Sequence, residues 1–263
     1  MIVNKLAGVF RFQKPRSSKK KKKKIVNYPL VALRGKVIFP ATDNSFDAGR
    51  LISLTAVSKA SERDMTLFVS YQRDAAKDEI TPQDVCSVGT VVKITQIAKL
   101  PSNNLRVSVR GLYRAKAEEI YEEDGCFYAN VSELKSVHGD PVLEEAYLRT
   151  AQDVLRDIAS SDARLAKEGL GGLEKITDAD EFIGEVLTFL HIKDDTKQEL
   201  LEMVNVVERL KLFERCLNDE LEIAKLERKI SATVRRSIDK NQKEYFLREQ
   251  LKAIHTELGD DEE

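Results

Sequence analysis

The sequence has no tryptophan, three cysteines, six prolines and no apolar run of the length that crosses a membrane. Cys86, Cys126 and Cys216 are scattered without a CxxC pair, so neither a disulfide framework nor a zinc-binding cysteine cluster is expected. A membrane-spanning helix needs roughly 18 or more consecutive apolar residues. We therefore expect a soluble cytoplasmic protein that makes no membrane contact and whose thiols are buried or inert.

Acidic residues are absent from the first 42 positions, which hold 12 of the 43 Lys and Arg residues. The remaining chain holds 31 basic and 44 acidic residues, so its formal charge is −13. Residues 1–26 are predicted to be a basic, disordered tail, because SSKKKKKK cannot bury apolar surface. A targeting or membrane-surface helix over MIVNKLAGVFRFQKPR is the less favoured interpretation. Candidate contacts to nucleic acid or another polyanion are Lys19, Lys20, Lys21, Lys22, Lys23 and Lys24.

Catalytic and cofactor-binding motifs are missing as well. The only Gly-Lys pair, Gly35-Lys36, lacks the upstream glycine and the following Ser or Thr of a phosphate-binding P-loop. Ser58 and Lys59 are adjacent, so on a helix they point in different directions, which argues against a Ser-Lys dyad. The three histidines have no metal-ligand spacing. We expect no catalytic residue, no cofactor-binding residue and no metal site in this chain.

Residues 27–137 are predicted to form a small mixed sheet or a partly closed barrel with one helix laid over it. Runs rich in β-branched and aromatic residues alternate there with a period of two. An extended segment is expected before a break at Gly35, and strands are expected at 36–40, 65–72, 89–100, 105–120 and 126–136, with a hairpin at PSNN. The helix is expected over 49–62, with one face formed by Leu51, Leu54, Thr55 and Ser58.

The apolar periodicity changes to 3.6 residues after Asp140, so residues 138–225 are predicted to form a helical lobe. Pro141 opens its first helix, and a later helix is capped by Thr177 or Asp178. The first helix is expected to bury Leu143, Tyr147, Val154 and Ile158. A last helical pattern of roughly 60 residues begins at Asp194 or Asp195, with one break expected near 216–219.

This last helical pattern has two sections. The first carries an apolar stripe that we expect to pack on the helical lobe, formed by Val206, Leu210, Phe213, Leu217, Leu221 and Ala224. Residues 226–263 are expected to project as a long helix, because their apolar face is narrow and flanked by Lys and Arg. A second stripe there is predicted to contact another copy of the chain or a protein substrate; it is formed by Leu247, Leu251, Ile254 and Leu258.

Four segments together resemble the amino-terminal region of the Lon proteases, which are ATP-dependent serine proteases with an AAA+ module. They are YPLVALRGKVIFP, DVCSVGTVVKITQIAKLPSNNLRVSVRGLYRAKAEEI, DDTKQELLEMVNVVERLKLFERCLNDELEIAKLERKI and NQKEYFLREQLKAIHTELG. The resemblance runs from about Tyr28 to Gly259 and implies an α+β fold: a small PUA-like β lobe with one helix, then an α-helical lobe ending in a long projecting helix. The segment ATDNSFDA departs from the family's apolar second strand, so the resemblance does not fix that sheet edge.

The resemblance implies a non-catalytic region that recognises unfolded or regulatory protein substrates and supports assembly with other copies, in a protease of protein quality control. The chain is expected to end where the ATPase module would begin, so ATP, Mg²⁺ and the Ser-Lys dyad are expected only outside it. The alternative is a nucleic-acid-binding PUA-like module with a polylysine arm, which the −13 charge of the remaining chain disfavours. A third interpretation, a coiled-coil scaffold, leaves the β lobe unexplained.

Overall fold

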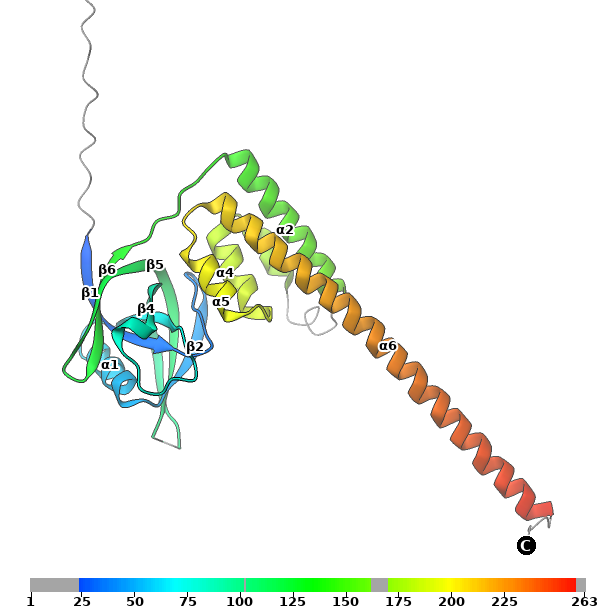
Figure 1. The fold of residues 1–263 in the computed structure, drawn as a ribbon. Helices are drawn as coiled ribbons and strands as arrows, with labels where there is room; N and C mark the ends of the chain where they lie inside the picture. Colours follow the sequence, from blue (N-terminus) through cyan, green and yellow to red (C-terminus); the bar gives the residue numbers. More distant parts are fainter. Residues whose placement is uncertain (1–23, 102, 162–169, 259–263) are drawn as a thin grey trace, which may run out of the picture.

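The computed structural model describes residues 24–101, 103–161 and 170–258, which form a β lobe, a helical lobe and a long projecting helix (Figure 1). This arrangement confirms the predicted α+β class. The elements of the β lobe are β1 (Ile25–Leu33), β2 (Asp43–Ala48), α1 (Leu51–Ser61), β3 (Thr66–Gln72), the 3₁₀ turn η1 (Pro82–Asp84), β4 (Val85–Lys99), β5 (Leu105–Glu123) and β6 (Cys126–Glu133).

The strands form one sheet that closes on itself, in the order β2-β5-β4-β3-β1-β6 with a further pairing between β5 and β6. Closure depends on the 19 residues of β5, because its first half pairs with β2 and its second half pairs with β6. The β1–β3 pair is parallel and the other pairs are antiparallel. The result agrees with the predicted partly closed barrel, and it leaves β2 at the edge of the sheet.

Helix α1 lies over the sheet, but with a different face from the one predicted. Its buried residues are Ser53, Ala56, Val57 and Ala60, whereas Leu51 is 80% exposed. Small side chains allow the helix to approach β1 and β6 closely, so the small residues are covered and the larger leucine stays outside. The predicted apolar face of this helix is therefore wrong.

The strand predicted at 36–40 is also wrong, since this segment is irregular and the strand forms later, at β2. Ile38 and Phe39 are buried in different apolar clusters, and the Ile38 carbonyl accepts a hydrogen bond from the Thr90 hydroxyl at 2.5 Å. In β2 the core-facing Phe46 and Ala48 alternate with exposed polar residues. A period of two therefore outweighs the low strand propensity of Asp, Asn and Ser.

The helical lobe follows the β lobe after residue 140. Its elements are α2 (Pro141–Ser161), the 3₁₀ turn η2 (Leu170–Lys175), α4 (Ala179–Phe189), α5 (Asp194–Glu202) and the start of α6 (Val206–Leu258). Asp178 caps α4 by accepting a hydrogen bond from the Glu181 backbone N–H at 2.9 Å, which confirms one of the two predicted caps. Phe182 of α4 and Phe213 of α6 meet edge to face, with ring centroids 6.0 Å apart, at the centre of the lobe.

Helix α2 buries a face shifted by about one residue from the predicted one. Leu148, Ala151, Leu155 and Ile158 are buried, whereas Leu143 remains exposed. The predicted Tyr147 and Val154 are only partly covered, and of the predicted set only Ile158 is fully buried. The shift follows from the packing of α2 along α6, which a single-helix periodicity does not reveal.

Helix α6 has 53 residues and is therefore about 80 Å long. Its predicted first stripe is confirmed at Val206, Leu210, Phe213, Leu217 and Leu221, which are all buried, whereas the sixth predicted member, Ala224, is only partly buried. The predicted break at 216–219 is wrong: the chain breaks at 203–205, between α5 and α6. Asn205 starts α6 there, with its side-chain oxygen accepting from the Glu208 N–H at 3.1 Å.

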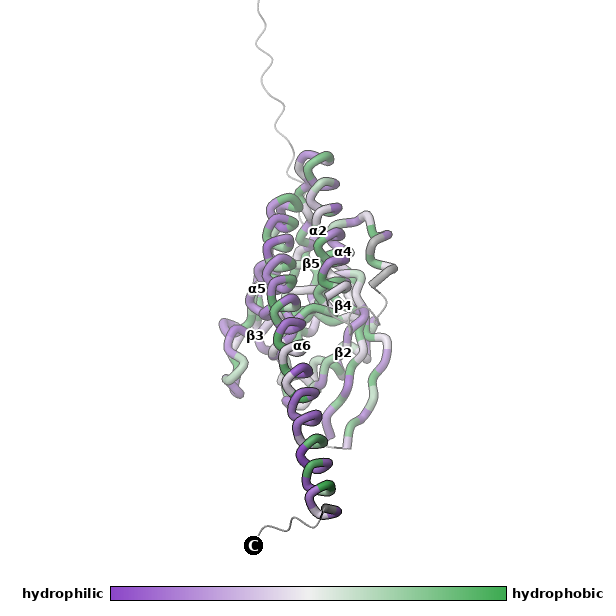
Figure 2. Tube along the Cα trace, turned by 90° about the vertical axis from the view of Figure 1, so that its right-hand side faces the viewer, coloured by the Kyte–Doolittle hydropathy of each residue, from purple (hydrophilic) through white to green (hydrophobic). Residues whose placement is uncertain are grey.

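The far half of α6 leaves the helical lobe, as predicted. Leu226, Ile230, Val234 and Ile238 are each about half exposed. Figures 1 and 2 show this part of the helix extending alone, with mostly hydrophilic residues interrupted by hydrophobic ones. Without tertiary contacts, its helical state depends on helix propensity and local pairs such as Lys240–Glu244.

Candidate functional site

Two arginines and one aspartate hold the β lobe against the helical lobe. Arg114 of β5 and Arg209 of α6 are each only 3% exposed at the side chain, and both contact the Asp180 carboxylate of α4. The closest nitrogen-to-oxygen distances are 2.5 Å for Arg209 and 3.7 Å for Arg114. The Ser136 hydroxyl donates to Asp180 and accepts from both arginines. We call these four residues the interlobe clamp.

The interlobe clamp is electrostatically unbalanced, because two buried guanidiniums share one carboxylate. Burial, together with repulsion from Arg114, lowers the pKa of Arg209 to about 10, although Asp180 acts to raise it. Burial also lowers the pKa of Arg114, whose guanidinium donates to the carbonyls of Leu201 and Met203 at 2.9 and 2.7 Å. The Ser136 hydroxyl is fully engaged in this network, so the cluster acts as a structural junction rather than as an activated nucleophile.

Sequence reasoning missed the interlobe clamp. Arg209 lies between Val206 and Leu210 on the buried stripe of α6, and a charge on an apolar stripe signals a buried partner. Arg114 gives no such signal. Leu112 is an extra residue in β5, because Gly111 and Tyr113 pair with neighbouring residues of β4. This bulge changes the alternation of the strand, turns Arg114 inward and leaves Leu112 exposed.

Close packing reinforces this junction. Gly184 of α4 faces the segment after residue 38, where an added Cβ atom would lie 3.0 Å from Phe39 Cβ and 3.3 Å from the Pro40 carbonyl oxygen. The buried Gln198 of α5 donates to the Val88 carbonyl of β4 at 3.0 Å. The two lobes are therefore joined by apolar, polar and ionic contacts at once, which favours a fixed orientation.

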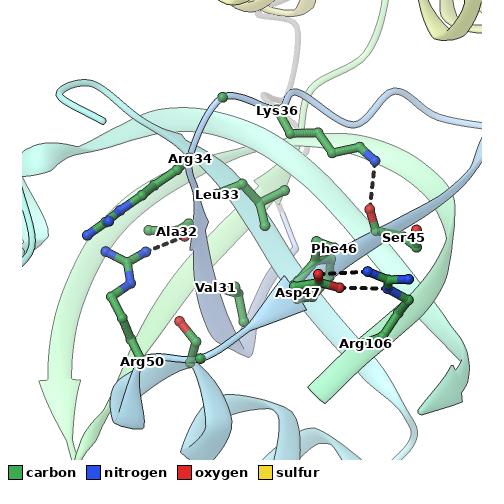
Figure 3. Close-up of a pocket in the computed structure, with 13 residues that line it drawn as sticks. Val31, Ala32, Leu33, Arg34, Lys36, Ser45, Phe46, Asp47, Arg50 and Arg106 are labelled. Atoms are coloured by element: carbon green, nitrogen blue, oxygen red, sulfur yellow. Dashed lines mark hydrogen bonds and ion pairs between the residues drawn. The ribbon is translucent and has the colours of Figure 1, made fainter. Parts of the chain in front are cut away.

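A cavity of about 560 Å³ opens between the end of β1 and the edge strand β2. Figure 3 shows Val31, Leu33 and Phe46 between two groups of polar side chains. On one side the Arg50 guanidinium donates to the Ala32 carbonyl at 2.7 Å. On the other, Lys36 Nζ donates to the Ser45 carbonyl at 2.6 Å and Arg106 pairs with Asp47 at 2.8 Å. We call this space the edge cavity.

The edge cavity contains two cations, Lys36 and Arg50, that form no direct ion pair with a carboxylate among the described residues. Arg34 pairs with Asp78 and Arg106 with Asp47, but among the described residues Lys36 and Arg50 make no ion pair and donate only to uncharged oxygens. Burial lowers the pKa of both, with Lys197 adding to the effect at Lys36 and Arg34 at Arg50, whereas the carboxylates of Asp47 and Asp78 partly offset it. An anion bound in the cavity would stabilise the charged forms of Lys36 and Arg50.

Apolar side chains are also exposed near the junction of the lobes. Val137 and Val204 are adjacent in space, because the Val137 N–H donates to the Val204 carbonyl at 2.7 Å, and both are exposed. Two further exposed residues, Val142 and Leu143, lie in the first turn of α2. Glu144 binds back to His138 and Gly139, which holds that turn beside the Val137 segment. We call these four aliphatic residues the junction patch.

The predicted contact residues of the far helix are exposed where the structure describes them. Leu247, Leu251 and Ile254 are each about half exposed on α6, and the side chain of Leu258 lies outside the described residues. Of the six predicted polyanion contacts, Lys24 is exposed just before β1 and Lys19–Lys23 lie outside the described residues. The roles of both groups stay predictions.

The structure separates the residues that a Ser-Lys dyad would need. On α1 the Ser58 hydroxyl lies 3.3 Å from Glu62 Oε1 and bonds to it, whereas Lys59 Nζ lies 3.6 Å from Asp124. Within residues 24–101, 103–161 and 170–258, no three His, Cys, Asp or Glu side chains are grouped so that they could hold a metal ion. The helices in those ranges include none with the length and apolar character needed to cross a bilayer.

The fold defines a two-lobed α+β domain with a projecting helix. The model of the ATP-dependent protease La (LON) substrate-binding domain matches residues 27–219, and the chain belongs to that family. This confirms the resemblance inferred from the four sequence segments.

Individual relatives support the same assignment. The chain is 38% identical over 240 residues to the Lon protease of Clostridioides difficile (strain 630), covering 89% of this chain and 30% of the relative. It is 34% identical over 237 residues to Lon protease 1 of Bacillus subtilis (strain 168), with the same coverage of 89% and 30%. The chain therefore spans about 30% of the length of these curated relatives.

A solved structure shows the same fold. The N terminal domain of Mycobacterium avium complex Lon protease superposes with a TM-score of 0.61 at 20% identity, covering 75% of this chain and 98% of that one.

Proposed function

We propose that this chain is the region of an ATP-dependent Lon-type protease that recognises unfolded or regulatory protein substrates. The observation that carries the proposal is the family match over residues 27–219. The junction patch supports it, because exposed aliphatic residues clustered on a folded surface suit weak binding of apolar polypeptide segments. Several copies held together would turn such weak contacts into useful avidity.

The proposal assigns no catalysis to this chain. Its described surface offers apolar and basic contact sites, and the one buried Ser-Asp-Arg cluster is the interlobe clamp. ATP, Mg²⁺ and a Ser-Lys dyad would be supplied by other parts of a longer protein, since the chain covers only 30% of a relative such as the Lon protease of Clostridioides difficile. We propose a cytoplasmic location and a homo-oligomeric assembly, in which α6 sets the distance between the recognition lobes and the rest of the protein.

Nucleic-acid binding is a second candidate function, and one structural observation favours it. Near the end of α2, one side of α6 forms an open groove of about 620 Å³ whose lining includes Lys225, Arg228, Lys229 and Arg236. Together with Lys19–Lys24 it could neutralise phosphates, which predicts weak and strongly salt-dependent binding. We rank this function second because the chain after residue 42 has a formal charge of −13.

The test of the first function uses the junction patch. The doubly substituted chain Val142→Ser plus Leu143→Ser should bind a permanently unfolded, fluorescently labelled client protein more weakly than the unchanged chain, by about threefold to tenfold. The matched control is Ile230→Ser plus Val234→Ser, which removes two exposed aliphatic residues from α6. Equal affinity of all three chains would show that the junction patch does not contribute to client binding. Failure of every chain to bind the client would overturn the proposed function.

A further inference from the structure

The outer edge of β2 is open for hydrogen bonding. Among the strands that the structure describes, β2 pairs with β5 alone, and the Thr42 carbonyl just before it accepts from the Gly111 N–H of β5 at 2.9 Å. Because the backbone groups of an antiparallel strand point alternately to either side, those of Asp43, Ser45 and Asp47 point away from β5. The Lys36 bond to the Ser45 carbonyl agrees with that direction.

The end of β1, across the edge cavity, has a similar feature. Pairing between β1 and β6 ends at Leu30, so Val31–Leu33 pair with β3 only. The Ala32 carbonyl accepts from Arg50 instead of from a strand. The end of β1 and the outer edge of β2 therefore border one cavity, and on each of them a basic side chain donates a hydrogen bond to a backbone carbonyl (Figure 3).

The dimensions and chemistry of the edge cavity suit an extended peptide. Its volume of about 560 Å³ lies within the range of about 300–1,000 Å³ that is usual for ligand sites. An added strand gains affinity from backbone hydrogen bonds and specificity from its alternate side chains. Here Val31, Leu33 and Phe46 offer an apolar floor, and Lys36 and Arg50 offer cations without a carboxylate partner among the described residues.

We propose that the edge cavity binds an extended polypeptide segment carrying a carboxylate, which adds to the outer edge of β2 as an extra strand. The segment takes over the Ser45 carbonyl from Lys36, and the released ammonium pairs with the carboxylate of the segment. This inference rests on the proposed function, because it states how one class of unfolded substrate is held. It also predicts a preference for acidic over basic segments.

Protection of the sheet edge is the competing explanation for the two cations. Lysine at an edge strand discourages pairing with other chains. If Lys36 only protects β2, its removal should promote self-association or peptide binding. If Lys36 also receives the carboxylate, its removal should weaken binding of an acidic peptide. The two explanations therefore predict opposite signs for the same substitution.

The probe is a fluorescein-labelled peptide of eight residues that alternates Thr and Val and carries one Glu near its middle, with an amidated C-terminus. Its affinity for the full 263-residue chain is measured by fluorescence polarisation. Lys36→Gln should weaken binding at least threefold. The matched control is Lys93→Gln, since Lys93 also donates to a backbone carbonyl, that of Asp64, but lies outside the edge cavity. Replacing the central Glu with Lys should abolish binding. A Gln-centred peptide with a free C-terminus, compared with its amidated form, tests whether a terminal carboxylate serves equally well.

The backbone contact is tested at Ser45. Ser45→Pro removes the outward N–H of an edge strand, where proline is tolerated. It should weaken binding of the acidic peptide about tenfold without changing the midpoint of thermal unfolding. Ser45→Ala keeps the N–H and should bind like the unchanged chain. Hydrogen exchange should show the Ser45 and Asp47 amides becoming protected when the peptide binds, while the Asn44 and Phe46 amides stay unchanged.

Two results would overturn the inference. One is tighter peptide binding by Lys36→Gln, and the other is unchanged affinity in Ser45→Pro with no new protection of β2. If unfolded client proteins still bind while the peptide does not, the edge-cavity inference fails and the proposed function stands. If neither the peptide nor the client binds, both fail.

Discussion

Neutralising Asp180 should destabilise the protein strongly, because Asp180→Asn leaves Arg114 and Arg209 buried without a carboxylate. Removing one member of a buried ion pair costs roughly 3–5 kcal/mol. The Asp180 side chain is 30% exposed, so we expect about 3 kcal/mol, at the lower end. For a chain of this size, each kcal/mol lowers the midpoint of thermal unfolding by about 2–4 °C. The expected decrease in Tm is therefore about 6–12 °C.

The assay is thermal unfolding followed by calorimetry and far-UV circular dichroism at neutral pH and moderate salt. Glu181→Gln is the matched control, because it neutralises the next carboxylate of the same helical turn, and that side chain is exposed. Its effect should stay within about 0.5 kcal/mol. Arg209→Met should cost less than Asp180→Asn, because it removes one of the two like charges and leaves Arg114, Asp180 and Ser136 together.

A loss of less than about 1 kcal/mol in Asp180→Asn, which is the usual value of an exposed ion pair, would refute this account of the interlobe clamp. So would a greater loss in Arg209→Met than in Asp180→Asn. Either result would mean that the orientation of the lobes depends on apolar packing at residues such as Gly184, with the charges contributing little.

Three further predictions concern other regions. The hydrogen bond from Glu144 raises the pKa of His138 above its usual 6.5, so NMR should find a lower pKa for His138 in Glu144→Gln than in the unchanged chain. The pair stabilises the folded state slightly; this contribution is complete below pH 6.5 and is lost as the pH rises through the pKa of His138 in the folded state. Replacing Leu251 and Ile254 together with Asp should weaken self-association in sedimentation while changing stability by no more than about 0.5 kcal/mol; a strict monomer before substitution would contradict this. Deleting residues 1–26 should abolish the weak, salt-sensitive binding of nucleic acid.

The parts of the fold that could be predicted from sequence are those with one uninterrupted periodicity. The α6 stripe from Val206 to Leu221 repeats every three or four residues, and all of its large apolar members are buried. The capping residue Asp178 was predictable for a similar reason, since a cap depends on its immediate neighbours.

The errors arose where tertiary packing selects among local options. Helix α1 buries its small residues because they allow close approach to the sheet, so hydrophobic size indicated the wrong face. A bulge at Leu112 turned Arg114 inward, and no local signal marks that residue. The break before Asn205 contains neither proline nor glycine. The edge cavity depends on the distance between β1 and β2, which are not paired, and no sequence pattern describes that distance.

Recognition of unfolded polypeptides is tested most directly by comparing two forms of one client. Reduced, carboxymethylated α-lactalbumin is permanently unfolded, and the native protein has the same sequence. We expect the chain to bind the unfolded form with a Kd of about 1 μM to 1 mM and the native form at least tenfold more weakly. ATP and Mg²⁺ should not change this affinity, and the client should remain uncleaved. Equal binding of both forms, or no binding of the unfolded form across that range, would contradict the account.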